Sequence, residues 1–180
     1  LTNPLKLHNT FKTQKKSPIS QDTIKKYLEY MQDAFLIDRA VRYDIKGRKY
    51  IDTPCKYYFE DLGLRNCHIG FNMQTDIHKL IENAIYLHLL HCRYEVFTGQ
   101  QSGGREIDFV ARRGDEVGYI QASYQLNDDS TRQREFGNLQ SIRNSYPKYV
   151  ISLDEWTSGS NVDGIRHIHL GEFLQNFEMI

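Results

Sequence analysis

The chain has 180 residues, of which 39% are hydrophobic and 12% aromatic, enough to build one compact domain or two small ones. No apolar run approaches the roughly 18 to 20 residues that span a bilayer, and the N-terminus lacks a signal-peptide pattern. The spacing of the three cysteines matches neither a disulfide framework nor a metal knuckle. We therefore expect a cytoplasmic protein with no membrane partner.

The net charge of zero hides an asymmetry along the chain. Residues 1–75 contain 13 Lys and Arg against 8 Asp and Glu, whereas residues 76–180 contain 10 against 15. This split predicts two domains, 1–75 and 76–180. The basic half is the better candidate for contacting phosphates, although a solvated basic face without a partner explains the charge equally well.

The first half predicts helices followed by a hairpin. Asn3 and Pro4 are typical of a helix start, and Ser20 of a second, in which apolar residues recur at helical spacing through Phe35. Two extended runs, 40–45 and 48–51, then flank a turn at Lys46-Gly47, and a third run, 56–59, follows Pro54. Helix, longer helix and basic-tipped hairpin is the order of a winged helix.

A winged helix would contact DNA with its longer helix and its hairpin tip. The cations available for phosphates are Lys25 and Lys26 on the helix and Lys46, Arg48 and Lys49 at the hairpin. Winged helices also serve as protein-interaction modules, and the acidic Asp22, Glu29 and Asp33 on the longer helix oppose phosphate binding. Both interpretations stay open at this point.

The second half predicts an α/β sandwich with a mixed sheet. A helix over 76–92 precedes three strand candidates, 94–98, 106–111 and 118–122. A helix after Thr131, strands at 149–153 and 164–170, and a closing helix over 171–177 complete the order. This order of helices and strands is typical of a sheet whose faces are covered by helices. The overall fold class is therefore mixed α+β.

Two of the predicted strands carry polar residues of interest. Asp108 lies on one and Gln121 and Ser123 on the next, around a turn at Gly114-Asp115-Glu116. This hairpin resembles that of metal-dependent nucleases of the PD-(D/E)xK, or restriction-endonuclease-like, type. Those enzymes need a lysine at the position that Ser123 occupies here, which argues against catalysis. Arg105 or Arg112 would be the nearby substitutes.

Glu82, on the predicted helix, completes a candidate metal site with Asp108 and Gln121. Magnesium takes oxygen ligands, and a bound ion there would activate water beside a phosphate. The alternative is that Asp108 belongs to a solvated strand face and that Gln121 is a satisfied edge residue. A nuclease, active or degenerate, is thus one interpretation of these residues.

Several segments together resemble the C-terminal region of a large family of bacterial and archaeal AAA+ superfamily ATPases, itself a domain of unknown function. They are Leu1–Leu7, Thr23–Leu36, Val41–Gly47, Lys56–Asn66, Glu82-Asn83, Glu106–Val110 and Tyr119–Gln121. The resemblance implies a winged helix joined to a nuclease-like domain, with an ATPase module as partner. Any ATP chemistry would belong to an N-terminal part that this chain lacks. Family members commonly lack the second-strand lysine, which implies an inactive nuclease-like domain.

We therefore expect a DNA- or partner-recognition region of an AAA+ ATPase. Two alternatives remain. One is an active magnesium- or manganese-dependent nuclease that uses Glu82, Asp108 and Gln121. The other is a purely structural protein-interaction module.

Overall fold

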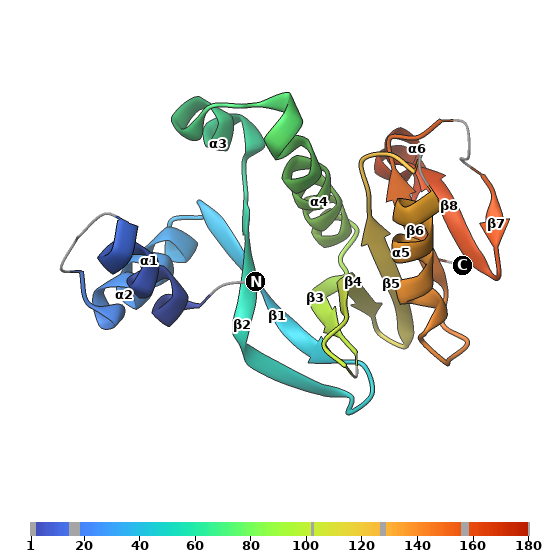
Figure 1. The fold of residues 1–180 in the computed structure, drawn as a ribbon, viewed down its shortest axis with the longest axis horizontal. Coiled ribbons are helices and arrows are strands. Elements are labelled where there is room, and N and C mark those ends of the chain that lie inside the picture. Colours follow the sequence, from blue (N-terminus) through green and yellow to red (C-terminus); the bar gives the residue numbers. More distant parts are fainter. Residues whose placement is uncertain (1–2, 15–18, 102, 127–128, 156–158, 180) are drawn as a thin grey trace.

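The described chain begins with two helices that stand beside the rest of the molecule (Figure 1). The computed structural model describes residues 3–14, 19–101, 103–126, 129–155 and 159–179. Helix α1 spans Pro4–Gln14 and α2 spans Gln21–Asp33. The Ser20 side chain accepts a hydrogen bond from the Thr23 N–H and caps α2, as its position predicts. Of the residues described, α1 buries none and α2 buries Ile24, so this pair contributes little to the core.

A long hairpin follows, formed by β1 (Ile37–Asp44) and β2 (Lys49–Phe59). The sequence predicts two runs divided at Pro54, but β2 continues through this proline. Strand β2 lies at the edge of the sheet, where a missing backbone donor is tolerated. Its register is also irregular there: Ala40 pairs with Lys56 and Arg42 with Ile51, so several β2 residues oppose Val41 alone.

Eight strands of the described residues form one mixed sheet in the order β2-β1-β3-β4-β5-β6-β8-β7. The pairs β1–β3, β5–β6 and β6–β8 are parallel and the others antiparallel. The remaining strands are β3 (Glu95–Gln100), β4 (Glu106–Arg113), β5 (Glu116–Ala122), β6 (Lys148–Ser152), β7 (Asn161–Val162) and β8 (Ile165–His169).

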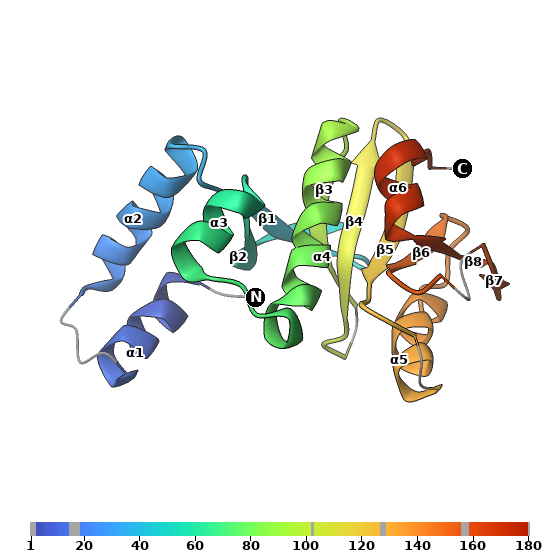
Figure 2. The same ribbon diagram turned by 90° about the horizontal axis from the view of Figure 1, so that it is seen from above.

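Helices cover the two faces of this sheet (Figure 2). Helix α4 (Met73–His91) and α6 (Leu170–Asn176) pack on one face, in a cluster around Ile85, Phe109 and Phe173. Helix α5 (Asp129–Gln140) covers part of the other, around Leu139 and Val150. The short α3 (Leu62–Ile69), which the sequence analysis did not predict, joins β2 to α4.

The mixed α+β class is confirmed, as are the predicted helices and most strands. The sheet passes across the expected boundary at residue 75, because β1 from the first half pairs with β3 from the second. The division into two domains stays a prediction. Within the described ranges, no helix has the length and apolar character that crossing a membrane requires.

Candidate functional site

A part-buried lysine joins two of the predicted site residues. The Lys56 Nζ lies 2.6 Å from Glu82 Oε1 and 3.2 Å from Asp108 Oδ1. The same Glu82 oxygen accepts a hydrogen bond of 2.6 Å from the Tyr58 hydroxyl, and Asp108 Oδ2 accepts one of 3.0 Å from the Ala122 N–H. We call Lys56, Glu82 and Asp108 the lysine centre.

A bulge in β4 aims Asp108 into this centre. Phe97 pairs with Val110 and Gly99 with Ile107, so Asp108 and Phe109 both oppose Thr98. The extra residue breaks the alternation of the strand and re-aims a side chain, as bulges near functional sites often do. Ile107 and Val110 therefore pack on the α5 face, whereas Phe109 packs on the α4 face. Asp108 meets Glu82 of α4 on that face.

Asn83 fixes β2 against α4. Its side-chain carbonyl accepts from the Phe59 N–H and its amide donates to the Phe59 carbonyl, both at 2.8 Å. Tyr58 stacks on Tyr86 of α4 with ring centroids 4.1 Å apart. These contacts position Lys56, two residues before Tyr58 on β2, beside Glu82.

Burial and charge set the protonation of the centre. Burial raises the pKa of the Asp108 carboxyl to about 6, although the adjacent Lys56 opposes this rise. Burial alone would lower the pKa of Lys56, but Asp108 and Glu82 together raise it above its usual value. Burial and the Glu82 carboxylate raise the pKa of the Tyr58 hydroxyl, which therefore remains a donor at neutral pH.

Gln121 does not join the lysine centre. Its neighbours Ile120 and Ala122 pack on the α4 face, so alternation along β5 directs Gln121 to the α5 face. Its side chain is buried there, and its Oε1 has no hydrogen-bond partner among the described residues. Ser123 is also buried and donates to the Gln125 carbonyl instead of reaching the carboxylates.

The centre offers two carboxylates to a cation. Magnesium usually keeps several waters and takes one or two protein carboxylates, so Glu82 and Asp108 are ligands of the type that magnesium prefers. The Lys56 ammonium, however, already lies between them and neutralises part of their charge. Among the residues that the structure describes, no group of three or more His, Cys, Asp and Glu side chains is arranged to hold a metal.

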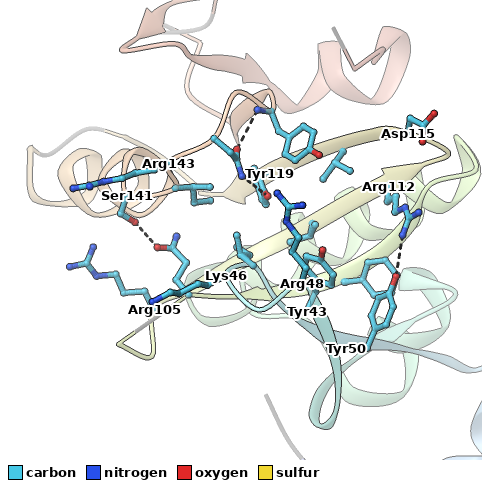
Figure 3. Close-up of a pocket in the computed structure, with 18 of the residues that line it drawn as sticks. Tyr43, Lys46, Arg48, Tyr50, Arg105, Arg112, Asp115, Tyr119, Ser141 and Arg143 are labelled. Carbon is cyan, nitrogen blue, oxygen red and sulfur yellow. Dashed lines mark hydrogen bonds between the residues drawn. The ribbon is translucent and has the colours of Figure 1, made fainter.

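A second site lies on the α5 face, where the helix leaves the sheet uncovered. It is a groove of about 910 Å³ between the β1–β2 turn, strands β3 to β5 and the connection from α5 to β6 (Figure 3). We call it the basic groove. Its cationic lining residues are Lys46, Arg48, Arg105, Arg112 and Arg143, and its aromatic ones are Tyr43, Tyr50, Phe97, Tyr119 and Tyr146.

The cations of the basic groove lack acidic partners. No described carboxylate lies within 4.0 Å of the charged nitrogens of these five residues. Among the described lining residues, Asp115 is the one with an acidic side chain. Unpaired cations along a groove favour a ligand that brings its own negative charge.

The β1–β2 turn places two of these cations. Asp44 Oδ1 accepts hydrogen bonds from the Lys46 and Gly47 N–H groups, at 3.1 and 3.0 Å. A Cβ on Gly47 would lie 2.6 Å from Asp44 Oδ2, so a larger residue there would displace the carboxylate that accepts these hydrogen bonds. It presents Lys46 and Arg48 to the groove, as the sequence predicts for the hairpin tip.

The other predicted phosphate contacts are not gathered here. Lys49 is exposed on β2 outside the groove lining, and Lys25 and Lys26 are exposed on α2. Figure 1 shows α2 well away from the β1–β2 turn. Arg105 and Arg112, the suggested substitutes for the missing lysine, line the groove instead of approaching Asp108.

Residues 2–75 match a domain of unknown function, DUF8612. An uncharacterized protein of Haemophilus influenzae (strain ATCC 51907 / DSM 11121 / KW20 / Rd) is 36% identical over 174 residues, which are 97% of this chain and 42% of the relative. The chain therefore spans less than half the length of this relative. No solved structure matches the chain. Neither description names an activity.

The residues that match DUF8612 form only part of the lysine centre and part of the basic groove. The match includes Lys56 and the β1–β2 turn, whereas Glu82, Asp108 and the groove residues Arg105, Arg112 and Arg143 lie beyond it. Both sites thus depend on the packing of the matched segment against the rest of the chain.

Sequence reasoning missed Lys56 and Arg143 as site residues. Lys56 lies in the Lys56–Asn66 segment that carries part of the family resemblance, and this was the available signal. Arg143 follows a helix without any motif, and folding alone brings it to the groove.

Proposed function

We propose that this chain recognises DNA through the basic groove. The observation that carries the proposal is the set of five groove cations without acidic partners among the described residues. Phosphates supply the matching charge, and such contacts provide most of the sequence-independent affinity for DNA. A cytoplasmic location is consistent with this ligand.

The architecture we propose is a winged-helix-like segment joined to a nuclease-like α/β domain of the PD-(D/E)xK type. The order α1, α2, β1, β2 supports the first part, and the order α4, β3, β4, β5, α5, β6 supports the second. The resemblance to AAA+ proteins supports an ATPase module as partner within a longer protein.

Binding of fluorescein-labelled DNA, followed by anisotropy over a range of salt concentrations, tests the proposal. Affinity should fall with salt at a log-log slope of about −0.9 per duplex phosphate contacted. Lys46→Ala and Arg143→Ala should each weaken binding and reduce the slope by about one phosphate contact. Lys26→Ala, an exposed lysine on α2, is the matched control and should change neither.

Two results would contradict the proposal. Binding that does not respond to salt would show that phosphates are not recognised. If Lys26→Ala weakens binding while the groove variants do not, contact runs through α2 in the manner of a winged helix.

The lysine centre favours a second function, that of a magnesium- or manganese-dependent nuclease. Lys56 brings to Glu82 and Asp108 the positive charge that Ser123 does not supply. A bound ion would provide Lewis-acid chemistry, and Lys56 would then stabilise charge on the phosphate. Because Lys56 now pairs with both carboxylates, any ion must compete with it.

Plasmid cleavage with either metal tests this second function. Wild type should cut, while Asp108→Ala and Lys56→Met should not, and Lys79→Met, an exposed lysine of α4, should behave as wild type. Cleavage that persists in Asp108→Ala would come from a contaminant. No cleavage with either metal leaves the centre as a structural ion-pair network.

Exposed apolar side chains support recognition of a protein partner as well. Tyr27, Tyr30 and Phe35 are 56%, 61% and 79% exposed, in or just after α2. Such a surface is typical of an interaction site, and an attached ATPase module is the partner we propose for it. Tyr30→Glu should then abolish co-purification with that module while DNA binding persists.

A further inference from the structure

Two of the aromatic rings that line the basic groove are open to solvent. Tyr50 is 53% exposed and Tyr146 is 38% exposed. Large aromatic side chains are usually buried, and contact with phosphates does not require them. Their position among unpaired cations points to a ligand that has flat rings as well as negative charge.

Both rings are supported from behind by other aromatic residues. The Tyr50 ring centroid lies 5.0 Å from that of Phe97 and 5.5 Å from that of Tyr43. Tyr146 lies 6.3 Å from Tyr119, whose hydroxyl accepts a hydrogen bond of 3.0 Å from Asn144. Neighbours on one side restrict each ring while its exposed part remains free to stack, so little entropy is lost on binding.

The two rings come from different elements that line the groove. Tyr50 belongs to β2 and Tyr146 to the connection between α5 and β6. Figure 3 shows Lys46 and Arg105 toward one end of the groove, Arg112 toward the other and Arg48 between them. A ligand along the groove would thus meet cations throughout its length and two exposed aromatic rings from separate elements.

The combination of cations and exposed aromatic rings favours single-stranded DNA over duplex DNA. In a duplex the bases are stacked inside and present only their edges, so exposed tyrosines gain nothing from it. In a single strand every base has a free face that stacks on aromatic side chains, while a basic groove follows the backbone. The volume of about 910 Å³ is also within the range of ligand pockets, which suits a few nucleotides.

We infer that the basic groove binds single-stranded DNA, with bases stacked on Tyr50 and Tyr146 and phosphates held by the surrounding arginines and lysine. This inference rests on the proposed function and names its substrate class. The groove lies on the α5 face of the sheet and the lysine centre on the α4 face, so the two sites are separate.

The test compares the full chain binding to fluorescein-labelled oligothymidylate of about 10 nucleotides, a typical single-strand site size, with binding to a duplex of equal length. The single strand should bind more tightly, with a salt slope of about −0.7 per phosphate. Tyr50→Ala and Tyr146→Ala should each weaken single-strand binding by about 5- to 150-fold, the effect of losing one stacked base.

Three variants control for other causes. Tyr50→Phe keeps the ring and should retain affinity within about twofold of wild type, since stacking requires only the ring face. Tyr30→Ala removes a tyrosine of α2 that is 61% exposed and lies outside the groove, and it should leave binding unchanged. Circular dichroism melting of each variant verifies its folding, which these exposed positions should not disturb.

The possible failures are distinct. If neither DNA form binds, the proposed function and this inference fall together. If duplex binds as tightly as single strand and Lys46→Ala weakens it while the tyrosine variants do not, the groove recognises DNA and the single-strand inference is wrong.

Discussion

Lys56 shows how much one side chain can depend on its surroundings. It is 16% exposed and contacts carboxylates that are 23% and 15% exposed, on α4 and β4. Removing one partner of such a group leaves charges buried without compensation, which costs far more than an exposed ion pair gains. The lysine centre is therefore a point at which β2, α4 and β4 depend on one another.

Lys56→Met should lower the free energy of unfolding by about 2 to 4 kcal/mol, because Glu82 and Asp108 would then repel each other with little solvent. Urea denaturation measures this change. Lys79→Met is the matched control, since Lys79 is 71% exposed and its surface ion pair with Asp76 should contribute little to stability. Equal losses in both variants would contradict a buried role for Lys56.

The raised pKa of Asp108 predicts that the stability of the protein depends on pH. Because burial raises its pKa to about 6, the folded chain binds a proton more tightly than the unfolded chain does. The contribution of Asp108 to stability is therefore fully present below about pH 4, falls as pH rises toward 6 and then levels off.

Urea denaturation of wild type and Asp108→Asn, from pH 4 to 7 in EDTA, measures this contribution. The free energy of unfolding of wild type should fall relative to that of the variant by about 3 kcal/mol, since one pKa unit corresponds to about 1.4. A constant difference across this range would show that the folded pKa is not raised.

Among the secondary-structure elements, β3 and β4 are constrained by a bulge and by a close approach at Gly99. The β4 bulge turns Asp108 toward α4, and Gly99 of β3 allows β1, β3 and β4 to approach closely at the floor of the groove. A Cβ on Gly99 would lie 2.9 Å from the Ile107 Cβ and 3.1 Å from Ile45 Cδ1. Glycine is thus required there by packing against neighbouring side chains.

Gly99→Ala should destabilise the protein by about 1 to 3 kcal/mol through overpacking. Gly137→Ala, inside α5, is a contrasting test, because no atom lies within 4 Å of its added Cβ. Higher helix propensity should make that variant more stable by up to about 1 kcal/mol. Thermal unfolding distinguishes the two, and a stabilised Gly99→Ala would mean that β3 is free to shift.

The whole molecule is organised around a sheet to which both halves of the chain contribute. Strand β1 pairs with β3, and Ala40 and Tyr58 from the first half lie in the core cluster of α4 and α6. The split in charge along the sequence therefore does not correspond to a split in the hydrophobic core.

We accordingly expect residues 1–180 to unfold in one cooperative transition, with equal calorimetric and van't Hoff enthalpies. A fragment of residues 76–180 should lack cooperative unfolding, since it loses the strands that cover Tyr86 and supply Lys56. Two separate transitions, or a folded fragment, would instead support independent domains at the predicted boundary.

Local patterns were sufficient to predict much of this molecule. Apolar spacing predicted α2 and α4, the residue type of Ser20 predicted a helix start, and extended runs predicted β4 and β5, because these features depend on residues close together in the chain. The same local logic identified Glu82 and Asp108 as candidates and placed Lys46 at a turn, with Arg48 at the start of the strand that follows it. These features require no knowledge of distant contacts.

Contacts between distant residues decided the rest. The one-residue bulge in β4 turns the Asp108 side chain to the α4 face of the sheet, where it lies near Glu82. Gln121 and Arg112 lie on the opposite face. Lys56 is 26 positions from Glu82 and 52 from Asp108, a distance that no periodicity within one element can report. The basic groove likewise exists only because a turn, three strands and a loop meet in space.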